Sequence, residues 1–387
     1  MRKLYYEDSM LRQFEAVVTA CTAAEDGFWV CLDATAFYPE GGGQACDLGY
    51  IGDARVTDVQ EREEQVLHLC DRPLEAGQRV SCTIDWEHRF DLMQQHTGEH
   101  IVSGVIHAMF GYQNVGFHVG ADVMTVDFDG ELTGEDIREI EERANRAVWE
   151  DIKLKCWIPN PQELETVVYR TKRALPWPVR IVQIPGIDSC ACCGVHTATT
   201  GQVGIIKLFS CVKFHQGARI EMACGKRVLD ILNGIYEQNR QVSQAFSAKA
   251  METGAAARHM NELLAAEKFR ANGLQRQLFA EKAKAYAGKA IAVCFEEDLE
   301  GGQLRAFAEE LAQVSKVGAA FSEAEQGCRV CLAGEAEQVK ALGSALAGAL
   351  GARGGGKAGY YQGSVCANRE KTEAFLREYT APFEQNS

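Results

Sequence analysis

Long apolar runs and a leader-like start are both missing from this chain of 387 residues. The opening residues, MRKLYYEDSM, lack the apolar stretch of a signal peptide. No run of about eighteen apolar residues occurs that would cross a bilayer. We therefore expect a cytoplasmic protein without a membrane partner.

A disulfide scaffold is also not expected, although the chain holds 15 cysteines. Small secreted domains rely on paired cysteines because they cannot build a sufficient core, whereas this chain is long enough for two or three compact domains. The number of cysteines is odd, so most are expected to be reduced thiols. Any cluster of cysteine with histidine then becomes a candidate metal site.

Basic side chains are in the minority, with 40 Lys and Arg against 54 Asp and Glu and a net charge of −14. This balance argues against a non-specific nucleic-acid-binding protein, because neutralising phosphates requires a surplus of positive charge facing the ligand. Residues 226–285 are the exception and form a basic segment.

Proline is scarce, and none lies between Pro185 and Pro382. Nothing in that stretch therefore removes a backbone donor from a long helix. Residues 226–285 are rich in Ala, Leu, Glu, Lys, Gln and Arg, and their apolar residues recur at three-to-four spacing, which predicts a long helix or helical stalk. Because an isolated helix needs a packing partner, we expect a homodimer formed through this segment and the domain that follows it.

The remaining patterns predict an α+β protein. Apolar and polar residues alternate in EAVVTAC, GFWVCLDAT and QRVSCTIDW, so residues 1–85 are expected to form a small β-barrel. Helical periodicity starts at Trp86 and opens a mixed α+β domain over residues 86–225. After the stalk, residues 286–387 alternate strand and helix patterns and are expected to form a small α/β domain.

Two pairs of metal-binding side chains share the same four-residue interval. On a helix, His96 and His100 of HTGEH lie on one face, at a distance that a single ion can bridge. In CCGVH, Cys192 and His196 lie on either side of Gly194, which indicates a tight loop presenting a thiolate and an imidazole together. Three imidazoles and one thiolate suit zinc. The sequence therefore predicts one Zn²⁺ per chain, held by these four side chains.

Several alternatives stay open at this point. Either Cys190 or Cys193 is able to replace Cys192 as the ligand. HTGEH also fits H-x-x-E-H, the inverted zinc-peptidase pattern in which Glu99 is the general base, although those peptidases take a later carboxylate as third ligand. The forward motif H-E-x-x-H is absent because Thr97 stands at the Glu position. Finally, four protein ligands are typical of a structural zinc, whereas a catalytic zinc keeps one position open.

Three segments occur in the order and spacing of a known domain: FYPEGGGQACDLG at 37–49, MQQHTGEHI at 93–101 and DSCACCGVHTATTGQVG at 188–204. They resemble the editing domain of alanyl-tRNA synthetase and its freestanding AlaX-type relatives. The helical segment and the ending GGGKAGYYQGS resemble the DHH-associated C-terminal domain of the large AlaX-type proteins. Residues 1–90 are too short for a class II synthetase catalytic core, so we expect a chain that edits without charging.

The resemblance implies an enzyme, an aminoacyl-tRNA hydrolase that acts on mischarged tRNA(Ala), mainly Ser-tRNA(Ala) and also Gly-tRNA(Ala). It implies that the zinc set lies in the editing domain, and that Thr97 and Gln44 are catalytic candidates able to bond a serine hydroxyl. The substrate-binding residues implied in the same way are Gly41, Gly42, Gly43, Gln44 and Gly194. On the residues alone, the three glycines are more simply a hairpin turn. A non-catalytic tRNA-binding or oligomerisation protein with a structural zinc is the alternative function.

A second glycine-rich segment, GARGGGKA at 351–358, nearly matches a P-loop. Ala358 replaces the magnesium-binding Ser or Thr, and a helical pattern rather than a strand comes before it, so we reject an ATP site. We predict instead either a nest of backbone amides that contacts an RNA phosphate or a helix C-cap followed by a loop. The tRNA-binding residues predicted here are Gly354, Gly355, Gly356 and Lys357.

Overall fold

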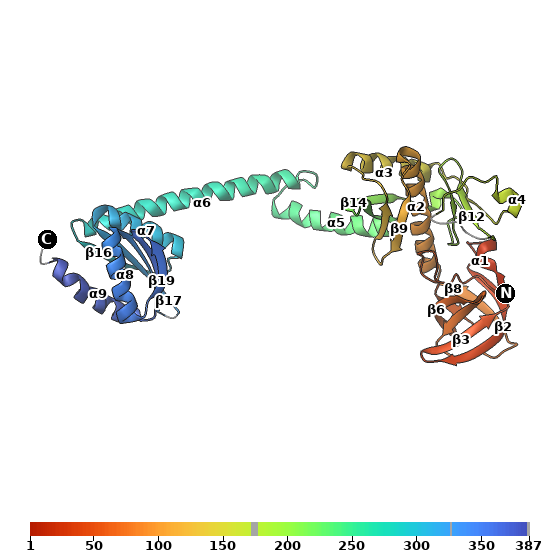
Figure 1. The fold of residues 1–387 in the computed structure, drawn as a ribbon, viewed down its shortest axis with the longest axis horizontal. Coiled ribbons are helices and arrows are strands. Elements are labelled where there is room, and N and C mark those ends of the chain that lie inside the picture. The colour runs from red at the N-terminus through yellow and green to blue at the C-terminus, as the bar shows by residue number, and fades with distance from the viewer. Residues whose placement is uncertain (172–176, 326, 385–387) are drawn as a thin grey trace. The chain divides into compact units, whose positions relative to one another are not determined.

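The computed structural model describes residues 1–171, 177–325 and 327–384, and the chain divides into two compact units, Met1–Gln241 and Val242–Ser387 (Figure 1). The mixed α+β class predicted from the sequence is confirmed. All 15 cysteines are free thiols. Among the described residues, no helix combines the length and the apolar character needed to span a membrane.

Six strands near the N-terminus close into a barrel in the order β2-β3-β7-β6-β5-β8. The alternation in β8 shows why: Val80, Cys82 and Ile84 are buried in the barrel core, while Arg79 and Ser81 are exposed. The strands are β2 (Gln13–Ala24), β3 (Gly27–Leu32), β5 (Gly49–Ile51), β6 (Ala54–Arg62), β7 (Gln65–Cys70) and β8 (Arg79–Ile84). Before and between them lie β1 (Arg2–Lys3), α1 (Leu4–Glu7) and β4 (Ala34–Thr35).

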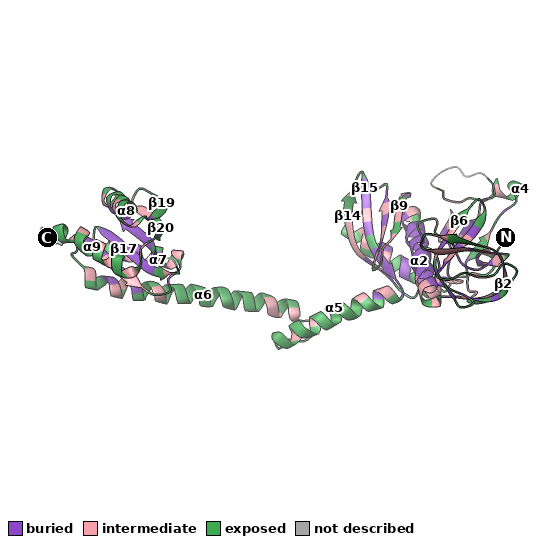
Figure 2. Ribbon diagram, turned by 90° about the horizontal axis from the view of Figure 1, so that it is seen from below, coloured by how far each residue is buried: buried purple, intermediate pink, exposed green. Residues whose placement is uncertain are grey.

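Helix α2 (Trp86–Phe110) is the central element of the first unit. Asp85 caps its first turn by accepting a hydrogen bond from the His88 backbone, and Gly111 ends it in the left-handed conformation. Every residue from 92 to 106 is buried, and seven of these residues are polar or charged. Figure 2 shows this helix in the colour of buried residues. A helix buried on all sides places its polar side chains inside the protein, where each needs a partner.

Two sheets pack around α2 and supply the rest of the candidate site. One has the order β14-β15-β10-β9, and the other has the order β11-β12-β13. Glycine lets the sheet and loop backbones approach the helix: a Cβ on Gly104 would lie only 2.5 Å from the Ile187 carbonyl oxygen. The bounds are β9 (Asn114–Val119), β10 (Met124–Phe128), α3 (Gly134–Trp149), β11 (Lys155–Trp157), α4 (Pro161–Leu164), β12 (Ile181–Ile184), β13 (Asp188–Ala191), η1 (Thr200–Val203), β14 (Ile206–Phe214) and β15 (Gly217–Cys224).

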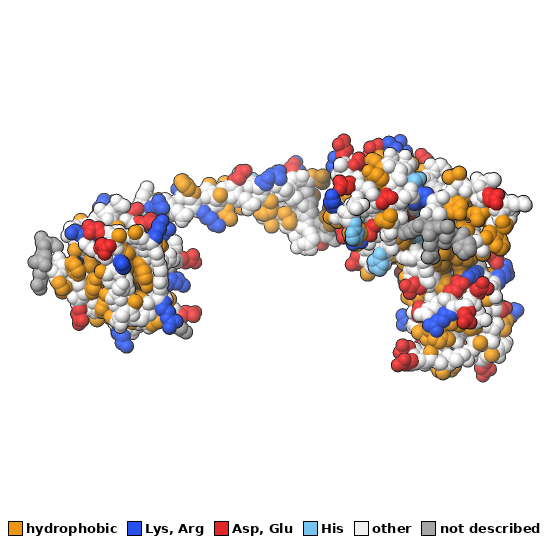
Figure 3. All heavy atoms as spheres, in the orientation of Figure 1, with side chains coloured by type: hydrophobic (Ala, Val, Ile, Leu, Met, Phe, Trp, Pro, Cys, Tyr) orange, Lys and Arg blue, Asp and Glu red, His pale blue; other side chains and the backbone are white. Residues whose placement is uncertain are grey.

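The predicted helical segment is interrupted. It consists of α5 (Lys226–Ala245) and α6 (Thr253–Ala283), so a single continuous helix is wrong. Ser247 has a φ of 49°, in the left-handed region, and the Ala248 backbone N–H bonds back to the Ser243 carbonyl, which closes the end of α5. Apolar side chains stand among charged ones on the surface of α6, including Leu264 and Phe269 (Figure 3).

The end of the chain forms a five-stranded sheet in the order β16-β17-β18-β20-β19, in which only β16 and β17 are parallel. Cys328 and Cys331 are fully buried on β18, as a buried strand requires. The bounds are η2 (Lys284–Tyr286), β16 (Ile291–Glu296), α7 (Gly301–Val314), β17 (Val317–Ala324), β18 (Gly327–Gly334), α8 (Ala336–Leu350), β19 (Arg353–Lys357), β20 (Tyr360–Val365) and α9 (Arg369–Glu384).

The second glycine-rich segment is not a nest of amides. Gly354, Gly355, Gly356 and Lys357 belong to the exposed edge strand β19, which pairs antiparallel with β20. Extended backbone directs successive N–H groups to opposite sides, so it cannot gather them around one phosphate. Of the alternative, a helix C-cap followed by a loop, the cap is confirmed at Gly351, which ends α8 with a φ of 64°, but the strand β19 follows it in place of the loop.

Candidate active site

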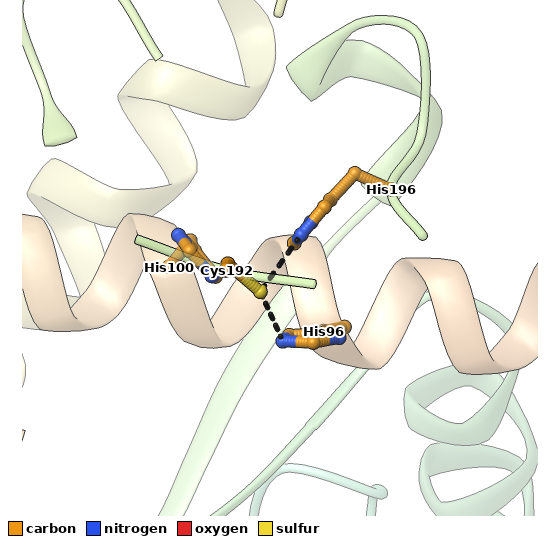
Figure 4. A group of neighbouring side chains, drawn as sticks. All are labelled: His96, His100, Cys192 and His196. Atoms are coloured by element: carbon orange, nitrogen blue, oxygen red, sulfur yellow. Dashed lines mark hydrogen bonds between the residues drawn. The ribbon is translucent and has the colours of Figure 1, made fainter. Parts of the chain in front are cut away.

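The structure brings the four predicted ligands together. His96 and His100 lie one turn apart on α2, and Cys192 and His196 reach them from the loop that follows β13 (Figure 4). Their candidate ligand atoms all lie within 4.8 Å of one another. The Cys192 Sγ is 3.4 Å from His96 Nε2 and 3.5 Å from His196 Nε2. The group is therefore able to hold a metal ion.

Each histidine has a second partner that fixes its ring. The Nδ1 of His96 is 2.8 Å from Gln44 Oε1, and because an amide oxygen only accepts, this Nδ1 carries the proton. His100 Nδ1 donates to Asp188 Oδ2 at 3.0 Å, and His196 Nδ1 faces the Thr97 hydroxyl at 3.3 Å. Outer partners of this kind set the tautomer and leave Nε2 for a metal. Sequence reasoning missed Asp188, although it opens the DSCACCGVH motif.

The surroundings of the cluster favour the ligand forms of Cys192 and His196, whereas His100 would have to lose a proton to bind a metal ion. Burial alone raises the pKa of the Cys192 thiol, but nearby His96 and hydrogen bonds from the other imidazoles lower that pKa well below its ordinary value. Burial lowers the pKa of His196 to about 3, helped by the charge of His96. Burial is the largest single effect on His100 and lowers its pKa, but the hydrogen bond to Asp188 and the negative charges of Cys192 and Glu99 together outweigh burial and raise this pKa well above the usual range. A thiolate and a neutral imidazole are the forms that bind metal ions.

The loop between Cys192 and His196 is held tightly against α2. A Cβ on Gly194 would lie closer than 3.0 Å to two atoms of the His96 ring, so only glycine fits. Arg180 Nη1 donates to the Cys192 and Gly194 carbonyls, at 2.9 and 2.8 Å. Sequence reasoning missed Arg180, because no spacing signal links it to this loop.

The first glycine loop is both a tight turn and a pocket wall. Gly41 and Gln44 exchange two backbone hydrogen bonds, of 3.1 and 3.0 Å, and the residues between them, Gly42 and Gly43, have φ values of 60° and 83°. Glycine adopts these angles without strain. Gly42 and Gly43 also line a pocket of about 790 Å³. The hairpin-turn interpretation and the pocket interpretation are therefore compatible.

The same pocket exposes three of the four ligands, His96, His100 and Cys192. Gly194 and Gln44 lie just behind its wall, since Gln44 is only 1% exposed. Thr97 is fully buried beneath the cluster, where its hydroxyl faces His196 and accepts a hydrogen bond from the Thr197 backbone. This geometry corresponds to a residue that positions His196 rather than to a contact with a substrate hydroxyl.

The two neighbouring cysteines do not join the four-residue group. Cys190 lies in a different group with His100 and Asp188, and Cys193 is exposed at the pocket. Cys192 is therefore the thiol placed to complete the set, as the four-residue interval predicted. Val195 is buried in the barrel core, and its backbone N–H donates to Gln44 Oε1 at 3.3 Å.

Two family models match the chain. Residues 4–88 match the model described as class II (A) tRNA synthetases, and residues 179–221 match the second additional domain of threonyl- and alanyl-tRNA synthetases. In the structure the first matched region forms the barrel, and the second carries Cys192 and His196.

The chain is similar along its full length to known proteins. It is 27% identical to the alanyl-tRNA editing protein Aarsd1 of Mus musculus, over 98% of both chains. It is 31% identical to the alanyl-tRNA editing protein AlaX-L of Pyrococcus horikoshii, over 61% of each. This chain is a homologue of the alanyl-tRNA editing proteins. It is also 35% identical to the alanine–tRNA ligase of Ignicoccus hospitalis over 64% of its own length, but this homologue spans only 28% of that ligase.

Proposed function

We propose that this chain is an aminoacyl-tRNA hydrolase that removes serine, and also glycine, from mischarged tRNA(Ala). The observation that carries the proposal is the ligand cluster, which opens on a pocket whose other wall is the glycine loop. Full-length similarity to an alanyl-tRNA editing protein supports the same conclusion. A pocket of about 790 Å³ lies in the range that small-molecule sites occupy, enough for the aminoacylated end nucleotide of a tRNA.

The metal proposed for the cluster is one Zn²⁺, held by His96, His100, Cys192 and His196. With Zn–S near 2.3 Å and Zn–N near 2.0 Å, tetrahedral ligands would place sulfur and nitrogen about 3.5 Å apart. The observed separations of 3.4 and 3.5 Å fit this arrangement. Because the four side chains would fill a tetrahedral zinc, the ion would polarise an ester carbonyl as a Lewis acid only by accepting it as an additional ligand. Exposure of three ligands in the pocket favours a role at the substrate over a purely structural one.

The chain's own groups would position the ester beside this cluster. The backbone of Gly41, Gly42 and Gly43 permits close approach because no side chains intervene. Gln44 lies just behind the pocket wall and accepts the hydrogen bond from His96 Nδ1, so we assign to Gln44 the positioning of His96 toward the substrate. Thr97 keeps His196 oriented. Editing is needed because a charging pocket sized for alanine cannot strongly reject glycine or a side chain that adds only a hydroxyl.

The test compares wild type with His96→Ala on Ser-tRNA(Ala) and Gly-tRNA(Ala). We expect the wild type to accelerate loss of both esters and His96→Ala to be at least about tenfold slower, the cost of disturbing a metal site. Circular dichroism and thermal melting check that the variant is folded. A wild type that binds zinc but hydrolyses neither ester would contradict the proposal and favour the non-catalytic tRNA-binding alternative.

A zinc peptidase is the weaker candidate. Cys192 and His196 complete the donor set here, in place of the later carboxylate that the inverted peptidase motif requires. Glu99 does line the pocket, so the peptidase alternative predicts that Glu99→Gln abolishes cleavage of peptide substrates.

For the second unit we propose two roles that belong with this function. Lys357 and the glycines of β19 would contact the RNA backbone from the exposed edge strand. The apolar side chains of α6 and the C-terminal domain would form a homodimer interface. Light scattering tests the second role, and a mass that stays that of one chain over a hundredfold range of concentration would refute it.

A further inference from the structure

Glu99 is a carboxylate on the pocket wall with one oxygen already bound and the other available. It lies on α2 between His96 and His100, directly before His100, and is only 6% exposed. Its Oε1 accepts hydrogen bonds of 2.5 Å from both Ser103 Oγ and Asn114 Nδ2. Its Oε2 lies 4.0 Å from His100 Nε2, the ring nitrogen turned away from Asp188. Within the described residues, no hydrogen bond reaches this Oε2.

Asn114 provides a second acceptor at the same place. It starts β9, lines the pocket and is 8% exposed. Its amide nitrogen must face the Glu99 carboxylate, because a carboxylate oxygen only accepts, and this fixes the orientation of the amide. Its Oδ1 is buried with no partner in the described part of the chain. A buried acceptor without a donor is uncommon and indicates a missing partner.

Two acceptors, one of them charged, call for a cationic donor. The proposed aminoacyl ester carries such a group, because its α-ammonium is attached one carbon away from the ester carbonyl. If the ester carbonyl is held at the ligand cluster, the α-ammonium group therefore lies close to Glu99, which directly precedes His100. The hydrogen bonds from Ser103 and Asn114 hold the carboxylate in place, so little side-chain entropy is lost when the ligand binds.

We propose that Glu99 Oε2 and Asn114 Oδ1 form the subsite for the α-ammonium group of the aminoacyl ester. This inference rests on the proposed function and assigns it a specificity: esters with a free amino group are bound, and esters whose α-position is neutral are bound weakly. Glu99 then acts by binding the substrate cation, and not as the general base that a peptidase would require.

The test measures binding without turnover, by calorimetry with two stable amides of 3′-amino-3′-deoxyadenosine. One carries serine, and the other carries glyceric acid, in which a neutral hydroxyl replaces the α-ammonium. Hydrogen bonds to charged groups contribute about 1.5–3 kcal/mol, so wild type should prefer the seryl amide by about 10- to 100-fold. Glu99→Gln keeps an oxygen for Ser103 and Asn114, so the fold is retained while the charge is lost. In this variant we expect the preference to fall to about threefold or less.

The matched control is Asp129→Asn, which removes the same charge from an exposed carboxylate at the same pocket. It should keep the wild-type preference. An unchanged preference in Glu99→Gln, or an equal loss of affinity for both amides, would overturn the subsite. If wild type hydrolyses Ser-tRNA(Ala) but binds the two amides equally, the subsite is wrong and the function stands. If wild type hydrolyses no aminoacyl-tRNA, the function itself is wrong and the subsite falls with it.

Discussion

Replacing Gly194 with alanine should damage the metal site without touching a ligand. The added Cβ would stand closer than 3.0 Å to two atoms of the His96 ring and 3.0 Å from Gln44 Oε1. Carbon atoms in ordinary contact are about 3.5–4.0 Å apart, so the ring must move by roughly 1.5 Å. The backbone of Gly194 is not in the left-handed region, so the side-chain clash is the main effect.

That movement breaks the 2.8 Å hydrogen bond between His96 and Gln44 and turns Nε2 away from Cys192. Loss of such outer support typically costs 10- to 100-fold in metal affinity, and we expect a loss of about that size for Gly194→Ala. Zinc affinity can be measured by competition with a chromophoric chelator at fixed pH. The control is Gly134→Ala in the same unit, where a Cβ meets nothing within 4 Å. Equal zinc affinities for Gly194→Ala and wild type would refute the packing argument.

Two further predictions concern Asp188 and His68. Asp188→Asn removes the charge that orients His100 through a 3.0 Å hydrogen bond, so zinc affinity should fall about tenfold or more, and an unchanged affinity in the same competition assay would count against the role of Asp188. His68 is buried in the barrel, where burial lowers its pKa to about 4, while the unfolded chain takes up a proton near pH 6.5. Because the unfolded state binds more protons between these values, stability should fall as the pH drops from about 6.5 to 4, by up to roughly 3 kcal/mol. Urea unfolding at pH 7 and pH 4.5 checks this, and His68→Gln should lose less stability between the two pH values than wild type does.

The ligand set was predictable because its signal is local. His96 with His100, and Cys192 with His196, each share an interval that a helix or a tight loop converts directly into proximity. The start of α2 was equally local, since Asp85 caps the helix where strand alternation gives way to helical periodicity. The two pairs meet because the loop after β13 packs against α2. The family resemblance predicted this meeting, and the spacing of the residues did not.

What could not be predicted depends on contacts between distant segments. Thr97 follows a ligand in sequence, yet its hydroxyl faces His196, which lies 99 positions further along. The unpaired Oδ1 of Asn114 follows from the orientation that Glu99 imposes, which no single-sequence pattern records. The end of α5 is set by a turn at Ser247, although residue types there favour helix. Absence of proline permitted a continuous helix but did not require one.

The most direct test of the central claim is the rate of deacylation of Ser-tRNA(Ala) relative to Ala-tRNA(Ala) by the zinc-loaded, full-length chain. An editing hydrolase should clear the seryl ester much faster than the correct alanyl ester, by at least about tenfold, because an enzyme that removed both would cancel correct charging. Equal rates for the two esters, or no acceleration of either above the uncatalysed reaction, would contradict the account.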